Sequence, residues 1–157
     1  MLDEKQLANL NRFCATWIRE LEVPAAELQD GETAFTSSFL LPWLTNKVST
    51  LNKAGLYVRG DGGPSIRPLI WEKISFFPDL AIVEGESTYI AFEVKVLTNN
   101  DSGGALNKGI GQTAMYANLG YASSFGLMFE NRWDEKDTLT WKNDVISGSN
   151  FIVAYFA

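Results

Sequence analysis

Apolar side chains recur along the N-terminal third of the chain at the spacing of amphipathic helices. Between residues 3 and 22 they fall every three or four positions, which places them on one helical face. These residues are Leu7, Leu10, Cys14, Trp17, Ile18 and Leu21. Residues 33–53 carry a second helical pattern, in which Pro42 is expected to kink or break the helix. Pro24 and Gly55 follow the two patterns and predict their ends.

After the second helix the pattern changes to the shorter period of β-strands. The expected strands are 56–59, 69–77, 80–83, 89–97, 124–130 and 150–157. A turn at 84–87 joins two of them into a hairpin. A loop at 98–104 precedes a helix at 105–119, which Gly120 ends. The charged segment 132–142 is expected to be exposed.

The strand expected at 89–97 has two faces of different character. One face carries four apolar side chains, those of Ile90, Phe92, Val94 and Val96. The other face carries Tyr89, Ala91, Glu93 and Lys95, because side chains alternate along a strand. A carboxylate and an ammonium on a buried strand face are costly unless they are paired or bound to something. This face is therefore a candidate functional site.

The order of elements predicts an α/β fold in which helices flank a central mixed sheet. The length of 157 residues fits one domain. We divide this domain into a helical part at 1–55, a core at 56–130 that carries the polar strand, and a C-terminal strand at 150–157.

Composition narrows the possible chemistry. The chain has no histidine and one cysteine, Cys14, for which we expect the role of a small buried residue on a helix. Serine–histidine and cysteine–histidine nucleophile systems, histidine-ligated metal sites and internal disulfides are therefore excluded. Carboxylate, lysine and metal chemistry remain, and oxygen ligands suit magnesium or manganese.

The net charge of −6 limits the partners of the chain. Phosphate contacts need basic side chains, so a nucleic-acid enzyme of this composition needs a local basic surface or a partner subunit. The basic candidates are Lys47, Lys53, Arg59, Arg67, Lys73 and Lys108. No apolar run is long enough to span a membrane, and the N-terminus does not resemble a signal peptide. We expect a cytoplasmic protein.

Asp79 follows Pro78 and precedes the strand at 80–83, so the hairpin is expected to bring it beside Glu93. Two carboxylates there repel each other, and a divalent cation removes that penalty. Lys95 can orient or help deprotonate an attacking water, or stabilise a charged phosphorane. The backbone carbonyl of Val94 can add an oxygen ligand. The group has the parts needed for metal-assisted hydrolysis of a phosphodiester.

These residues resemble the motif of the PD-(D/E)xK nuclease superfamily, because Pro78-Asp79 is followed, after thirteen residues, by Glu93-Val94-Lys95. Gln112 and Tyr116, four apart on the following helix, look like the Q-x-x-x-Y signature of the RecB-like branch. The resemblance implies a restriction-endonuclease-like core, a Mg²⁺- or Mn²⁺-dependent nuclease acting on DNA, and a phage or defence setting.

The resemblance also implies roles for individual side chains. Asp79 and Glu93 would bind the metal ion, and Gln112 would hydrogen-bond near it. Tyr116 would pack beside Gln112 or touch substrate, and Lys108 is a candidate substrate contact. A glutamate on the preceding helix is an additional ligand in many members, for which Glu32 is the first candidate here and Glu27 the second. A homodimer or a partner subunit is a further expectation.

Simpler interpretations remain open for each residue. Asp79, Glu93 and Lys95 can form an ordinary surface ion pair, Tyr116 can be a buried helix residue, and Glu32 can be a helix N-terminal carboxylate. The glycines at 60–63 lack the lysine and serine or threonine of a phosphate-binding loop, so they are expected to form a turn. Most aromatic residues are expected in the core, namely Trp17, Phe35, Phe39, Trp43 and Trp71. Trp133 and Trp141 are candidates for exposed, base-stacking residues.

Two alternatives to a nuclease also remain. The chain can be a non-catalytic or regulatory subunit that keeps the nuclease fold within a larger defence or repair complex. It can also be an acidic protein that mimics nucleic acid, although its scattered lysines argue against this role.

Overall fold

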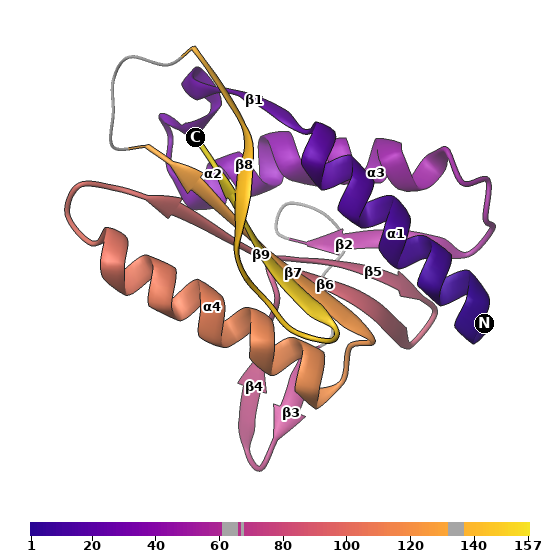
Figure 1. The fold of residues 1–157 in the computed structure, drawn as a ribbon. Coiled ribbons are helices and arrows are strands. Elements are labelled where there is room, and N and C mark those ends of the chain that lie inside the picture. The colour runs from indigo at the N-terminus through magenta and orange to yellow at the C-terminus, as the bar shows by residue number, and fades with distance from the viewer. Residues whose placement is uncertain (61–65, 67, 132–136) are drawn as a thin grey trace.

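The computed structural model describes residues 1–60, 66, 68–131 and 137–157 (Figure 1). Within these ranges, one curled mixed sheet contains seven strands in the order β1-β8-β9-β7-β6-β5-β2. The strands are β1 (Glu22–Pro24), β2 (Leu56–Gly60), β5 (Leu80–Glu84), β6 (Ser87–Leu97), β7 (Ser123–Glu130), β8 (Thr138–Ser147) and β9 (Phe151–Phe156). The central strands β6, β7 and β9 run parallel to one another, and the outer pairs are antiparallel. The expected mixed α/β architecture is confirmed.

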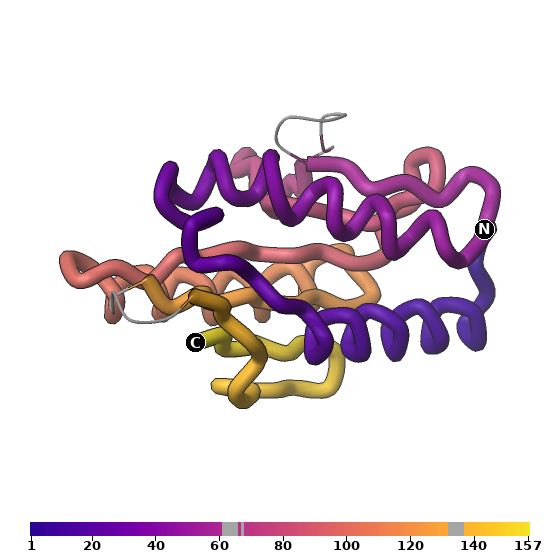
Figure 2. Tube along the Cα trace, turned by 90° about the horizontal axis from the view of Figure 1, so that it is seen from above, coloured from indigo at the N-terminus to yellow at the C-terminus, as the bar shows by residue number. Residues whose placement is uncertain are grey.

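Helices cover both faces of this sheet. They are α1 (Glu4–Glu20), the 3₁₀-helix η1 (Ala25–Leu28), α2 (Glu32–Phe35), the π-helical segment η2 (Thr36–Leu40), α3 (Leu41–Ser49) and α4 (Ser102–Leu119). The helices before residue 50 pack on one face and share its apolar core with alternate residues of β6. Helix α4 packs on the opposite face, against β6 and β7 (Figures 1 and 2).

The first helix begins and ends as its sequence predicts. The Asp3 side chain accepts a hydrogen bond from the Gln6 backbone N–H at 2.8 Å, and the Gln6 side chain returns one to the Asp3 backbone N–H. This reciprocal cap satisfies two backbone donors at the helix start. Cys14 lies in the core, as expected.

The second helical region is continuous through Pro42 rather than broken there. Segments α2, η2 and α3 follow one another without a gap, and Pro42 lies in the first turn of α3. Proline has no backbone N–H to donate to the preceding turn. The wider π-helical turn of η2 lies where that hydrogen bond is missing. A missing backbone hydrogen bond is a common cause of π-helical segments. The predicted break at Pro42 is therefore wrong, and the irregular turn lies one turn before the proline.

Strands β5 and β6 form the expected hairpin, with Glu84 and Ser87 flanking its turn. Leu80 pairs with Phe92 and Ile82 with Ile90, but Val83 pairs with Thr88. Tyr89 is therefore the extra residue of a β-bulge. Its side chain packs with the apolar face of β6 instead of sharing the face of Glu93, so the prediction for Tyr89 is wrong.

Residues 69–77 are not one strand, as the sequence pattern predicted. They form the hairpin of β3 (Leu69–Trp71) and β4 (Ile74–Phe76), a separate two-stranded sheet. Glu72, in the two-residue turn between them, has a φ of 57°. Glycine or asparagine usually occupies this left-handed conformation. Because residue 72 is a glutamate, the turn could not be recognised from the sequence. The hairpin projects beyond the C-terminal end of α4 (Figure 1).

The C-terminal region contains a strand that the sequence pattern did not predict. Residues 138–142, expected to be exposed charged chain, begin β8, which pairs with β9 and with β1. Trp141 is partly buried, donates to Asp144 and lies under the Arg19 guanidinium, so it is not a free stacking residue. The predictions for the glycines at 61–63, for Arg67 and for Trp133 lie outside the described residues.

Candidate functional site

The site begins where β5 ends and leaves one edge of β6 open. Leu80, the first residue of β5, pairs with Phe92, so β6 continues past this partner. The Val94 N–H donates to Asp79 Oδ2 at 2.7 Å, and the Val96 N–H donates to Glu32 Oε2 at 3.0 Å. Two carboxylates thus occupy hydrogen-bonding positions that a neighbouring strand would otherwise fill.

Glu93 and Lys95 lie on the face of β6 that is covered by α4. The Lys95 Nζ atom is 2.8 Å from Glu93 Oε1 and 3.8 Å from Glu32 Oε1. The Glu93 side chain is 2% exposed and that of Lys95 is 14% exposed. The prediction that these two residues share a face, with Asp79 beside them, is confirmed. Burial of the pair does not fit the interpretation as an ordinary surface ion pair.

Negative charge exceeds positive charge around this pair. Burial, the Asp79 charge and the Glu32 charge together raise the pKa of Glu93 to about 7, although the hydrogen bond and charge of Lys95 oppose them. Burial acts to lower the pKa of Lys95, but its hydrogen bond to Glu93 and the surrounding carboxylates outweigh burial and leave the pKa raised. Among the described residues, three carboxylates and one ammonium form a site that an additional cation would stabilise.

Helix α4 closes the site from the side of the sheet that carries Glu93. Tyr116 is 1% exposed, and its hydroxyl donates to the Phe77 carbonyl at 2.8 Å. Burial, followed by the charges of Glu93 and Asp79, raises the pKa of Tyr116 well above its ordinary value, so its hydroxyl stays protonated. The expected substrate contact is not met, because this side chain has almost no accessible surface. Tyr116 instead ties α4 to the segment that leads into Asp79.

Two glycines that sequence reasoning missed allow α4 to lie this close. A Cβ atom at Gly109 would lie 2.5 Å from Met128 Cε and 3.0 Å from Lys95 Cγ. Gly126 pairs with Glu93 across β6 and β7, and a Cβ there would lie 2.6 Å from Thr113 Oγ1. Gly109 and Thr113 are small residues one helical turn apart. This spacing in the sequence could have predicted a close approach of the helix to the sheet.

The donor set fits a hard cation such as magnesium. Glu93 Oε2 is buried and accepts no hydrogen bond from the described residues, and the same holds for Gln112 Oε1. Buried oxygens without partners commonly mark the place of a water or an ion. No group of three or more acidic, histidine or cysteine residues is arranged to hold a metal within the described part of the chain. Magnesium does not need such a cage, because it is bound through one or two carboxylates plus water and substrate phosphate.

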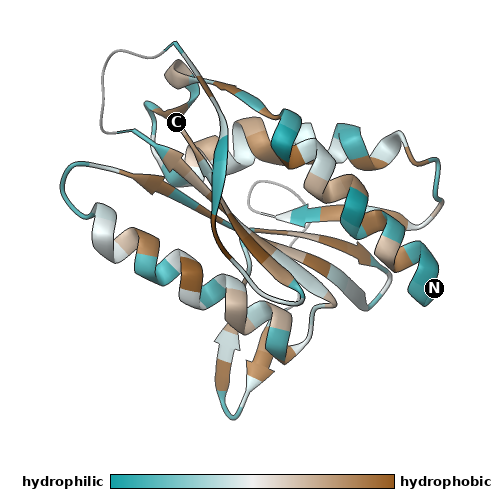
Figure 3. Cartoon of the chain, in the orientation of Figure 1, coloured by the Kyte–Doolittle hydropathy of each residue, from teal (hydrophilic) through white to brown (hydrophobic). Residues whose placement is uncertain are grey.

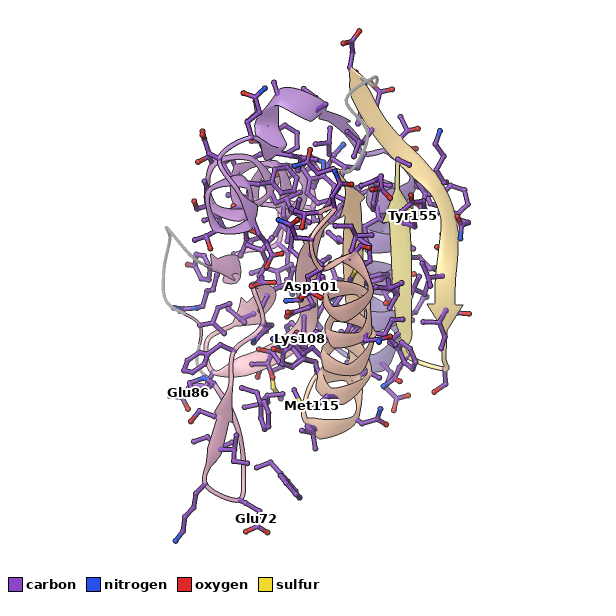
Figure 4. All side chains as sticks on the ribbon, turned by 90° about the vertical axis from the view of Figure 1, so that its left-hand side faces the viewer. Glu72, Glu86, Asp101, Lys108, Met115 and Tyr155 are labelled. Carbon is purple, nitrogen blue, oxygen red and sulfur yellow. The ribbon has the colours of Figure 1, made fainter. Side chains whose placement is uncertain are left out.

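The remaining predicted residues lie at different distances from this centre. Val94 directs its N–H toward Asp79, and its carbonyl points to the same side because the N–H and C=O of a strand residue share one edge. Glu32 reaches the site from the start of α2. Glu27, in η1, is exposed, and the contact at Val96 favours Glu32 as the helical carboxylate. Lys108 is exposed on α4, between Asp101 and Met115 in Figure 4.

Comparisons with family models, with curated proteins and with solved structures find no match for this chain. Within the described residues, no helix is both long enough and apolar enough to cross a membrane. Inference about function therefore rests on the geometry of the residues around β6.

Proposed function

We propose that the chain is a magnesium- or manganese-dependent deoxyribonuclease with a restriction-endonuclease-like core of the PD-(D/E)xK type. The observation that carries the proposal is the grouping of Asp79, Glu93 and Lys95 at the open edge of β6. A surface ion pair would leave the charges in water. This group is instead covered by α4 and contains a carboxylate oxygen that has no hydrogen-bond partner among the described residues.

In this proposal Asp79 and Glu93 hold the metal ion, and the Val94 carbonyl and Glu32 are further oxygen ligands. A bound ion supplies Lewis-acid chemistry at the phosphate and lowers the pKa of a bound water. The Lys95 ammonium, fixed by Glu93, contacts a phosphate oxygen or orients the attacking water. Gln112 Oε1, which accepts no hydrogen bond from the described residues, would accept one from that water. Tyr116 holds α4 against the Asp79 segment, and Lys108 is a candidate phosphate contact.

Cleavage of plasmid and single-stranded DNA in the presence of Mg²⁺ or Mn²⁺ tests this assignment. Lys95→Ala removes the partly buried ammonium and is expected to lower the cleavage rate about 100-fold or more, the usual effect of losing one electrostatic contact to a transition state. Lys5→Ala, on the exposed side of α1, is the matched control and is expected to cleave at the wild-type rate. Equal cleavage rates for Lys95→Ala and wild type would contradict the assignment.

The second candidate is a non-catalytic subunit that keeps the nuclease fold, with DNA held mainly by a partner protein. Its supporting observation is the net charge of −6, which is unfavourable for unaided DNA binding. Calorimetric titration with Mn²⁺ separates the two candidates. The nuclease is expected to bind the ion and to lose binding in Asp79→Asn, which keeps an acceptor for the Val94 N–H. A binding subunit has no need of an ion at this site.

A further inference from the structure

The β3–β4 hairpin carries an apolar surface that the fold does not use. Three of its side chains and that of Phe77, the residue after β4, are more than half exposed: Ile70 (69%), Trp71 (55%), Ile74 (52%) and Phe77 (57%). Figure 3 shows hydrophobic residues on this projecting hairpin, away from the main sheet. Trp71 was expected in the core, and its exposure is the largest departure from the predicted aromatic core. Apolar patches of a few hundred Å² on a monomer are often functional.

The base of the hairpin is fixed to the fold, and its outer part is not. Leu69 and Phe76 pair with each other and pack against the small core that contains Tyr116 and Tyr121. Trp71 and Ile74 pair next to the turn and continue the same face beyond that core. This arrangement presents apolar side chains on a rigid base, so they remain exposed without collapsing onto the body.

Apolar side chains occur on both faces of the hairpin. Trp71 and Ile74 lie on one face, whereas Ile70 lies on the other opposite Ser75, and Phe77 follows the end of β4. A hairpin that docks flat on a protein surface needs one apolar face only. Apolar side chains on both faces fit an element that enters between surfaces, as apolar wedges do when they separate neighbouring bases.

The hairpin is also continuous with the proposed active site. Phe77 is two residues from Asp79, and its carbonyl accepts the Tyr116 hydroxyl at 2.8 Å. Figure 4 shows the hairpin tip at Glu72 below α4, along which Lys108 and Met115 follow one another. A nucleic acid held at the hairpin therefore lies next to the residues proposed to cleave it.

A second copy of the chain is a poorer occupant. A stable interface needs roughly 800 Å² from each partner, more than four half-exposed side chains supply. Bases need far less area, because each one stacks on a single aromatic ring. Stacking also suits an acidic chain, since it does not depend on many phosphate contacts.

We infer that the β3–β4 hairpin binds unpaired bases where single-stranded DNA meets duplex, with Trp71 and Phe77 as stacking residues. The inference rests on the proposed function for the class of substrate. It adds that the preferred DNA contains unpaired bases, and that the hairpin supplies this preference.

Fluorescence anisotropy with labelled oligonucleotides in EDTA, where no cleavage occurs, tests the inference. The probes are a forked duplex with unpaired arms and a blunt duplex with the same number of phosphates. Wild type is expected to prefer the fork, and Trp71→Ala and Phe77→Ala are each expected to weaken fork binding about tenfold while leaving duplex binding unchanged. Trp71→Phe keeps an aromatic ring and is expected to retain most of the preference.

Phe13→Ala is the matched control, because Phe13 is an exposed aromatic residue on α1 rather than on the hairpin. Circular dichroism checks that each variant is folded. Equal fork binding by wild type and both alanine variants would overturn the inference, as would a dimer in sedimentation that Trp71→Ala dissolves. Fork preference without cleavage in Mg²⁺ contradicts only the proposed nuclease, and cleavage without any effect of the hairpin variants contradicts only the inference.

Discussion

Glu93 is the residue at which charge and burial conflict most. Its pKa of about 7 lies above the ordinary value near 4.5, because burial and the neighbouring carboxylates disfavour the charged form. The folded state therefore holds the proton more tightly than the unfolded state. Stability contributed by this group is present at low pH and is lost as pH rises from about 4.5 through 7. The loss amounts to about 3 kcal/mol by linkage.

Glu93→Gln in metal-free protein tests whether the raised pKa of Glu93 causes this pH dependence of stability. The amide is neutral at every pH, so the variant is expected to lack the decline that wild type shows between pH 4.5 and 7. Urea unfolding in EDTA across this range measures the difference in the free energy of unfolding. Glu27→Gln, an exposed glutamate, is the control and is expected to follow wild type. Parallel pH curves for wild type and Glu93→Gln would contradict the account of this site.

Alternation along one strand was enough to predict which way Glu93 and Lys95 point. The same rule failed for Tyr89, because a bulge depends on the register with β5 and not on the local pattern. It also gave no reason to expect Trp71 at the surface. Hydrophobic character alone assigns a large aromatic residue to the core, and only the position of the hairpin shows otherwise.

At the scale of elements, the close packing of α4 on β6 and β7 positions Lys95. Gly109→Ala places a methyl group against Met128 and the Lys95 stem. Both neighbours are flexible, so we expect a small loss of stability, about 1 kcal/mol. A displaced Lys95 ammonium is expected to reduce cleavage about 10- to 100-fold, because small misplacements of a catalytic group are costly.

Gly111→Ala is the control on the same helix. A methyl group there meets no neighbour within 4 Å, and alanine favours a helix over glycine by about 0.5–1 kcal/mol. We therefore expect a more stable protein with unchanged cleavage. Urea unfolding and initial rates of plasmid nicking measure both quantities. Loss of cleavage in Gly111→Ala to the same extent as in Gly109→Ala would show that the helix, and not its contact with Lys95, is responsible.

Elements with a strong internal pattern were predictable, and those defined by their neighbours were not. Helix α1, the β5–β6 hairpin and strand β7 follow from hydrophobic spacing and turn residues. Strand β8 carries polar and charged side chains and is recognised as a strand through its pairing with β9 and β1. The turn at Glu72 lacks the glycine or asparagine that usually marks a two-residue hairpin turn.

The charge of the whole molecule limits how the proposed nuclease can hold DNA. A net charge of −6 weakens long-range attraction to phosphates, so DNA binding by this chain would need local basic side chains or stacking. If the hairpin supplies affinity through stacking, fork binding is expected to depend weakly on salt, with about tenfold or less change between 50 and 200 mM. Anisotropy titrations over this range measure the slope. A loss of about 1,000-fold would indicate many phosphate contacts instead.

The carboxylates at the open edge of β6 come from distant parts of the chain. Asp79 and Val94 are 15 positions apart, and Glu32 and Val96 are 64 positions apart. Closing the larger loop costs chain entropy. The packing of α2 on the sheet offsets this cost. A chain in which α2 is not docked therefore keeps the short-range Asp79 contact and lacks the Glu32 carboxylate at this edge.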